Sequence, residues 1–112
     1  MSDLVDIGAI DEFAPDEPVL KRVGDVNVCV ARVGDKMFAI HDTCSHAMES
    51  LSAGWIEEGA VACPRHGAAF SLRTGEPQTP PATDGVPTFP VEIVDGRVMV
   101  DPTPSRPHNL LG

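Results

Sequence analysis

The sequence has no tyrosine, one tryptophan, and only 8 lysine and arginine residues against 17 aspartate and glutamate residues, giving a formal net charge of −9. Because nucleic acids and anionic lipid surfaces bind clustered basic side chains, this charge argues against both as partners. No hydrophobic run is long enough to span a membrane, and the first residues lack the basic and apolar parts of a secretory signal. We therefore expect a cytoplasmic protein that binds neither nucleic acid nor membrane.

Cysteine is also scarce, with three residues in the chain. An odd number without paired spacing does not indicate a disulfide framework, which agrees with a reducing compartment. The chain of 112 residues has the length of one domain. A domain this short buries a modest share of its surface, so a metal centre would help to stabilise it.

Short apolar runs broken by glycine, proline and aspartate recur along the chain, which is typical of β-strands. No apolar period of 3.6 residues runs far enough for a helix beyond one turn near residues 10–13. We expect strands over residues 19–23, 26–33, 37–41, 55–56, 60–63, 69–72, 89–94 and 97–100. Two-residue turns are expected at Gly34-Asp35, Glu58-Gly59 and Asp95-Gly96.

These strands predict an all-β fold: a small antiparallel β-sandwich or barrel base with one inserted subdomain. The base would comprise about residues 1–41 and 84–101, and the insertion about residues 42–83. Residues 102–112 are rich in proline and are expected to form an extended C-terminal tail.

The insertion contains two pairs of metal-binding residue types, Cys44-Ser45-His46 and Cys63-Pro64-Arg65-His66, with sixteen residues between His46 and Cys63. Residues two apart in an extended segment point the same way, and Pro64 favours a tight turn between Cys63 and His66. Each pair follows an apolar run. Two loops at one end of a small β-unit could therefore converge on a metal.

Three kinds of site use these residue types. A Cys₂His₂ zinc site accepts the same four ligands, although zinc pairs usually read as two cysteines followed by two histidines. A Cys–His nucleophile pair would leave the second cysteine and histidine unused. The mixed order fits an iron–sulfur cluster in which one iron binds both thiolates and the other binds both imidazoles.

Residues 38–82 resemble the cluster-binding part of soluble Rieske ferredoxins, which serve multicomponent ring-hydroxylating dioxygenases. The resemblance implies a Rieske fold holding one [2Fe–2S] cluster. Cys44 and Cys63 would bind the inner iron, whereas His46 and His66 would bind the outer iron at the docking surface. The residues expected to shield or surround the cluster are Pro64, Arg65, Ala68, Phe70, Pro80 and Pro81.

The resemblance implies a monomeric electron carrier and not an enzyme. It would take single electrons from a flavin-dependent NAD(P)H reductase and pass them to the terminal oxygenase of a system for aromatic hydrocarbon catabolism. An alternative is the small Rieske subunit of an assimilatory NAD(P)H nitrite reductase. A more distant one is a zinc-stabilised structural or interaction domain.

Two departures from the wider family are informative. Glu49 and Arg65 replace the cysteines that form a disulfide in respiratory Rieske proteins, so we expect a salt bridge between them. Ala68 and Phe70 replace a serine and a tyrosine whose hydroxyls donate to the cluster or its ligand in high-potential members. Without these donors the reduced cluster is less stable, which predicts a low reduction potential.

Three further residues have no expected role in metal binding. Cys29 lies in a valine-rich run and is expected to be a small buried hydrophobe. His41 is expected at the end of a strand. Trp55 is expected to pack between the inserted subdomain and the base.

Overall fold

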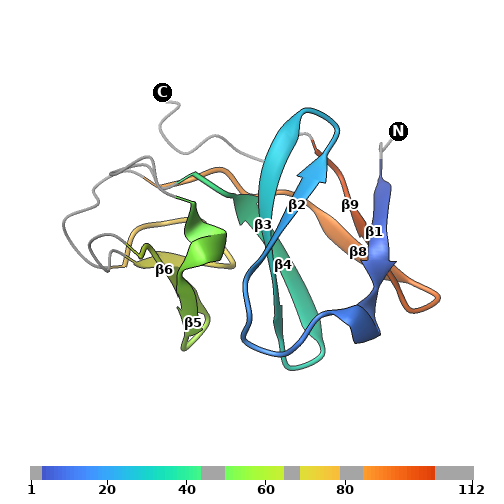
Figure 1. The fold of residues 1–112 in the computed structure, drawn as a ribbon, viewed down its shortest axis with the longest axis horizontal. Helices are drawn as coiled ribbons and strands as arrows, with labels where there is room; N and C mark the ends of the chain where they lie inside the picture. Colours follow the sequence, from blue (N-terminus) through green and yellow to red (C-terminus); the bar gives the residue numbers. More distant parts are fainter. Residues whose placement is uncertain (1–3, 44–49, 65–68, 79–84, 103–112) are drawn as a thin grey trace.

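The computed structural model describes residues 4–43, 50–64, 69–78 and 85–102, and these residues form three small antiparallel sheets (Figure 1). Helical structure in these ranges is limited to two short 3₁₀ helices, η1 (Ile10–Glu12) and η2 (Leu51–Ala53). The prediction of an all-β fold is therefore confirmed. No described helix has the length and hydrophobicity needed to cross a membrane.

Each sheet has three strands. In spatial order they are β1 (Val5–Ala9), β9 (Arg97–Val100) and β8 (Val91–Val94); β2 (Val19–Val23), β3 (Val26–Val33) and β4 (Lys36–His41); and β5 (Trp55–Glu57), β6 (Ala60–Ala62) and β7 (Ala69–Ser71). The predicted bounds of β2 and β3 are confirmed. The strand predicted from residue 89 starts later, at Val91, directly after a proline that has no N–H for the ladder.

The central sheet owes its position to β3, which is buried on both faces. Val28 and Val30 point into a hydrophobic core shared with β9, whereas Cys29 and Ala31 point into a second core shared with β6 and β7. The continuous apolar run of β3 follows from this double burial. Figure 1 shows β2, β3 and β4 between the two outer sheets.

Two hairpins have the turns that the sequence predicts. Glu58 and Gly59 have φ angles of 52° and 78°, and Asp95 and Gly96 have φ angles of 51° and 76°. Two consecutive residues with positive φ form the type I′ turn, whose twist matches that of paired antiparallel strands. The first of these turns joins β5 to β6 and so shapes the outer sheet that carries Cys63.

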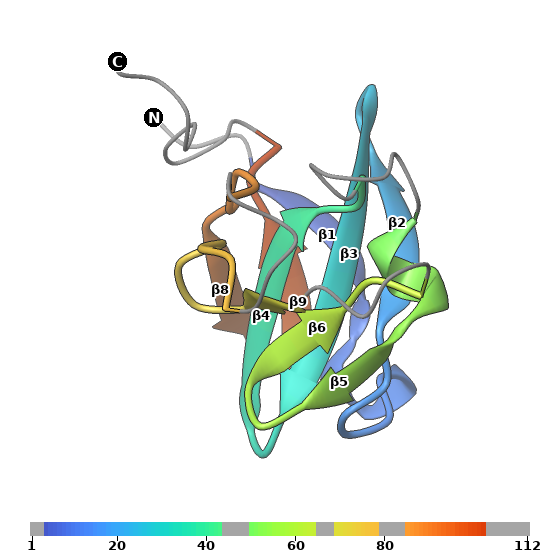
Figure 2. The same cartoon turned by 90° about the vertical axis from the view of Figure 1, so that its left-hand side faces the viewer.

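That outer sheet lies against one side of the central sheet, as Figure 2 shows with β5 and β6 in front of β3 and β4. Val61 and Phe70 of the outer sheet pack in one hydrophobic cluster with Ile40 of β4. All three side chains are fully buried. The cluster therefore fixes the outer sheet relative to the rest of the fold.

Candidate metal centre

The structure describes one of the four predicted metal ligands, Cys63, together with the predicted neighbours Pro64 and Phe70. The other site residues lie outside the described residues: Cys44, His46, His66, Glu49, Arg65, Ala68, Pro80 and Pro81. In the part of the chain that is described, no three His, Cys, Asp or Glu side chains group as a metal site. Cys63 and the described residues that flank the other predicted ligands therefore define the surroundings of the predicted site.

Cys63 follows directly on the last residue of β6 and is fully buried. Its side chain belongs to the same hydrophobic cluster as Val61 and Phe70. Ala62 pairs with Ala69 across the β6–β7 ladder, so residues 63–68 connect two strands that are hydrogen-bonded to each other. The sheet therefore fixes where Cys63 lies, and Pro64, which follows it, is an exposed turn residue.

The segment that contains Cys44 and His46 is closed at its base by backbone contacts. Thr43 and Ser50 form an antiparallel bridge, and the Leu51 N–H donates to the Asp42 carbonyl at 2.6 Å. The Asp42 N–H in turn donates to the Asn27 carbonyl at 3.1 Å. The residues on either side of 44–49 are thus held together and attached to β3.

The carboxylate of Asp42 adds a second set of contacts to the same place. It accepts hydrogen bonds from the Ser50 hydroxyl and, at 2.9 Å, from the Ser52 N–H. The hydroxyl oxygens of Ser50 and Ser52 are 2.8 Å apart. Asp42 is 4% exposed, and no other polar or charged residue in the described ranges is classed as buried. A buried carboxylate is tolerated because these donors replace its water.

Replacing Asp42 by alanine is expected to loosen the first ligand segment. The Ser52 N–H loses its acceptor, and leaving such a donor unsatisfied costs about 1–3 kcal/mol of folding free energy. We expect iron to leave the variant faster than the wild type when a chelator is added. Absorbance decay in chelator and urea denaturation measure the two effects. Ser50→Ala keeps the Asp42 carboxylate and its hydrogen bond from the Ser52 N–H, so Ser50→Ala should lose iron more slowly than Asp42→Ala. Equal rates of iron loss from the wild type and from Asp42→Ala would contradict the role of Asp42 in holding this segment.

The ends of three segments meet in one hydrophobic cluster. Leu51, Cys63 and Val86 are all buried members of it, and they flank residues 44–49, 65–68 and 79–84 respectively. The Gln78 N–H donates to the Ala69 carbonyl at 2.6 Å, which holds the start of the third segment against β7. The arrangement therefore brings the described ends of both ligand segments and of the predicted proline loop to one region.

Gly54 allows the first two of these segments to come together. A Cβ atom on Gly54 would lie 1.7 Å from the carbonyl oxygen of Ala62, the residue before Cys63. The φ angle of Gly54 is −90°, so glycine is needed here for space and not for a left-handed conformation. The turn after η2 thus packs backbone against backbone on the strand that leads to the second ligand pair.

Cys29 and His41 are the cysteine and the histidine in the described residues that are not predicted ligands, and both have structural surroundings. Burial, followed by the negative charge of Asp42, raises the pKa of the Cys29 thiol to about 12, as expected for a cysteine that packs as a small apolar side chain inside β3. His41 ends β4, accepts a hydrogen bond from the Thr43 N–H on Nδ1 at 3.2 Å, and stacks against Phe89. Both residues therefore have the structural roles expected from the sequence.

The sequence reasoning missed Asp42 and Gly54 and was wrong about Trp55. Trp55 was expected to be packed inside, but it is 47% exposed on β5. Nothing in the sequence marks Asp42 as buried, because its hydrogen-bond partners become visible only in the fold. Gly54 had a weak signal, since a glycine directly before a strand often marks a close backbone approach.

Comparison with known proteins adds the identity of the metal centre. Residues 3–90 match the family of the Rieske [2Fe-2S] domain. The ferredoxin subunit of anthranilate 1,2-dioxygenase from Burkholderia cepacia is 46% identical over 95 residues, which covers 85% of this chain and 88% of that protein.

Solved structures show the same likeness. The ferredoxin of carbazole 1,9a-dioxygenase from Nocardioides aromaticivorans IC177 superposes with a TM-score of 0.88 and 32% identity, covering 91% of this chain and all of that one. A ferredoxin in a complex of reduced oxygenase and oxidized ferredoxin in carbazole 1,9a-dioxygenase gives a TM-score of 0.87 and 34% identity. That match covers 95% of this chain and 99% of the other.

Proposed function

Because the chain belongs to the Rieske [2Fe–2S] domain family, we propose that it is the ferredoxin component of a ring-hydroxylating dioxygenase system. It binds a Rieske-type [2Fe–2S] cluster and carries electrons to an oxygenase rather than transforming a substrate itself. The observation that carries this function is the 46% identity to a dioxygenase ferredoxin subunit over most of both chains. We favour an oxygenase over a nitrite reductase as acceptor for the same reason.

Within this proposal the four ligands are Cys44 and Cys63 on one iron and His46 and His66 on the other. The donor set fits, because two thiolates and two imidazoles are what a Rieske cluster requires. The cluster supplies a reversible one-electron couple. The described residues do the rest: Cys63 offers its sulfur from a fixed strand end, and Asp42 closes the base of the segment that contains Cys44 and His46.

Reconstituted electron transfer tests the proposed function. A flavin-dependent NAD(P)H ferredoxin reductase, this chain and the carbazole 1,9a-dioxygenase or anthranilate 1,2-dioxygenase oxygenase are combined with the oxygenase's substrate. We expect product to form only when the chain is present with its cluster. Reduction of the chain without any transfer to either oxygenase, together with tight association with a sirohaem protein, would instead favour the nitrite reductase alternative.

The reduction potential is expected to lie low in the Rieske range, nearer about −150 mV than about +300 mV. Phe70 is fully buried in the cluster of side chains that includes Cys63, and its ring has no hydrogen-bond donor. The alanine at position 68 of the sequence has no side-chain hydrogen-bond donor either. Protein-film voltammetry measures the midpoint. Ala68→Ser should raise it by adding a donor that stabilises the reduced cluster; a clearly positive wild-type midpoint would contradict the argument.

The remaining parts of the proposal rest on the sequence. We propose that the protein works as a monomer in the cytoplasm. A reducing environment suits free cysteines, and Cys29 and Cys63 form no disulfide here. His46 and His66 are proposed to face the partners. Glu49 and Arg65 are proposed to form an ion pair between the two ligand segments.

A further inference from the structure

The exposure of Trp55 is unusual. It is the only tryptophan of the chain, and nearly half of its side chain is exposed on β5. Fully burying a large apolar side chain stabilises a protein by about 1.5–3 kcal/mol, and much of that gain is forgone here. The other exposed large hydrophobic residues in the described ranges lie on strands of the other two sheets: Val5, Leu20, Ile93 and Val94.

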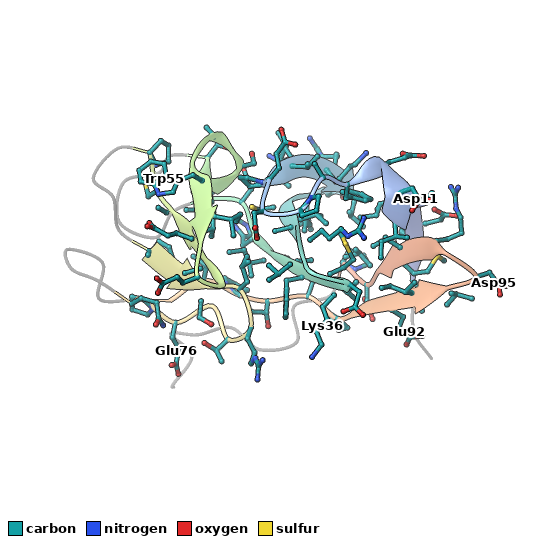
Figure 3. The ribbon with its side chains drawn as sticks, turned by 90° about the horizontal axis from the view of Figure 1, so that it is seen from below. Asp11, Lys36, Trp55, Glu76, Glu92 and Asp95 are labelled. Carbon is teal, nitrogen blue, oxygen red and sulfur yellow. The ribbon has the colours of Figure 1, made fainter. Side chains whose placement is uncertain are left out.

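The strand register places Trp55 next to the metal centre. Trp55 pairs with Ala62, the residue directly before Cys63. From the spacing of paired strands and the rise per residue, the Cα atoms of Trp55 and Cys63 are about 6 Å apart. Figure 3 shows Trp55 at the end of the molecule that carries β5 and β6, far from Asp11 and Asp95 at the other end. A partner that covers the end of the sheet where Cys63 lies therefore comes near Trp55.

The side chains around Trp55 favour a protein contact. Ile56 packs against the core, so the alternation along β5 turns Trp55 to the opposite, outer face of the sheet. Its cross-strand neighbours on that face are the small residues Ala62 and, one strand further, Ala69. Among these three neighbouring residues, Trp55 has by far the largest apolar side chain. Buried tryptophans are among the side chains that contribute most to protein–protein binding.

The charges near Trp55 indicate what kind of surface it meets. Glu57 is exposed two residues along β5 on the same face, and Glu58 is exposed in the adjoining turn. The whole chain has a net charge of −9. Glu58 also borders a hollow lined by Lys36 and Arg73, so the acidic character beside Trp55 comes from Glu57 and from the net charge of the whole chain. Such a surface complements a basic surface around an apolar pocket.

We propose that Trp55 is the docking anchor for the terminal oxygenase, inserting into an apolar pocket that lysine and arginine residues surround beside the electron-accepting centre. This inference rests on the proposed function, and it adds a residue that is not a metal ligand to the binding surface. A ferredoxin of this fold is known in complex with an oxygenase, which makes the oxygenase the partner to test. Trp55 acts through binding, so it leaves the cluster itself unchanged.

Electron-transfer kinetics with Trp55→Ala tests the proposal. The acceptor is whichever of the carbazole 1,9a-dioxygenase and anthranilate 1,2-dioxygenase oxygenases the wild type reduces faster. We expect the KM for the variant to rise about tenfold or more, the size of effect that a central binding residue has, with the midpoint potential and the rate of reduction by the reductase unchanged. Trp55→Phe should recover part of the loss. Leu20→Ala removes an equally exposed apolar side chain from β2 and should behave as wild type.

A second readout follows the side chain itself. Wild-type protein containing 5-fluorotryptophan gives one ¹⁹F resonance, which should shift when unlabelled oxygenase is added. An unchanged KM for Trp55→Ala, an unshifted resonance at saturating oxygenase, or a loss confined to reduction by the reductase would each overturn the docking site and leave the proposed function standing. If the wild type reduces neither oxygenase, the proposed function fails and the docking site fails with it.

Discussion

Cys63→Ala is expected to lose the cluster completely, whereas Cys29→Ala should keep it. The two cysteines are both fully buried and belong to the same hydrophobic cluster, so each substitution removes one sulfur atom from a similar environment. They differ in position, because Cys63 lies where β6 ends and Cys29 lies inside β3. Without the Cys63 thiolate, one iron of the cluster lacks a ligand, and we expect no neighbouring side chain to replace it. Iron in the purified variant should fall from about two atoms per chain to near zero.

Iron and acid-labile sulfide analysis, with the visible absorption spectrum, measures this difference. Cys29→Ala serves as the matched control, and it should have the metal content of the wild type with only the modest loss of stability that a small buried cavity causes. Cys63→Ala is also expected to be less stable, because a small domain loses the folding free energy that its metal provides. A full complement of iron in Cys63→Ala, or loss of iron from Cys29→Ala, would show that the ligands have been assigned incorrectly.

Gly54→Ala is expected to be strongly damaging, although Gly54 is not a predicted ligand. The added methyl group would lie 1.7 Å from the Ala62 carbonyl oxygen, and both partners in this clash are backbone. Neither side can give way without moving η2 or β6, and these elements lead to the two ligand segments. We expect a loss of about 3 kcal/mol or more in folding free energy, at the upper end of overpacking effects, together with weaker iron binding. Urea denaturation and the rate of iron release to a chelator measure the two effects.

Gly59→Ala separates the steric effect from the general cost of replacing a glycine. Gly59 lies in the turn that joins β5 to β6, and a Cβ atom there would meet no other atom within 4 Å. Its φ angle is +78°, so alanine should cost about 1–2 kcal/mol through backbone strain alone. The cluster should remain bound. Similar stability and iron release for Gly54→Ala and Gly59→Ala would mean that the close approach to Ala62 does not position the ligand segments.

The sequence predicted most of the fold because its local signals agree with the tertiary structure. The four central residues of β3, Val28–Ala31, are all apolar, as a strand segment buried on both faces must be, and the predicted bounds of β3 are those observed. The two-residue turns at Glu58-Gly59 and Asp95-Gly96 are set by residues that accept positive φ angles. The strand β1 was not delimited, because Gly8 interrupts its pattern at an irregular register with β9.

The site was predictable only where the ligand types themselves carry the information. Cysteine and histidine at motif spacing indicated the metal, and the buried position of Cys63 at a strand end agrees with that prediction. The contacts of Asp42 join Ser50, Leu51 and Ser52 to Asn27 of β3, and the space at Gly54 depends on a strand that follows later in the chain. Trp55 was expected to pack between the inserted subdomain and the base, but it is exposed on β5, because the face on which it lies is set by the pairing of β5 with β6.

The central claim is that two thiolates bind one iron while two imidazoles bind its neighbour. Mössbauer spectroscopy of ⁵⁷Fe-enriched, oxidised protein tests it most directly, because the isomer shift and quadrupole splitting report the ligands of each iron separately. We predict two doublets of equal area, one from an iron bound only by sulfur and one from an iron that also has nitrogen ligands. A single doublet from equivalent sulfur-bound irons, or a colourless protein that contains zinc, would contradict the account.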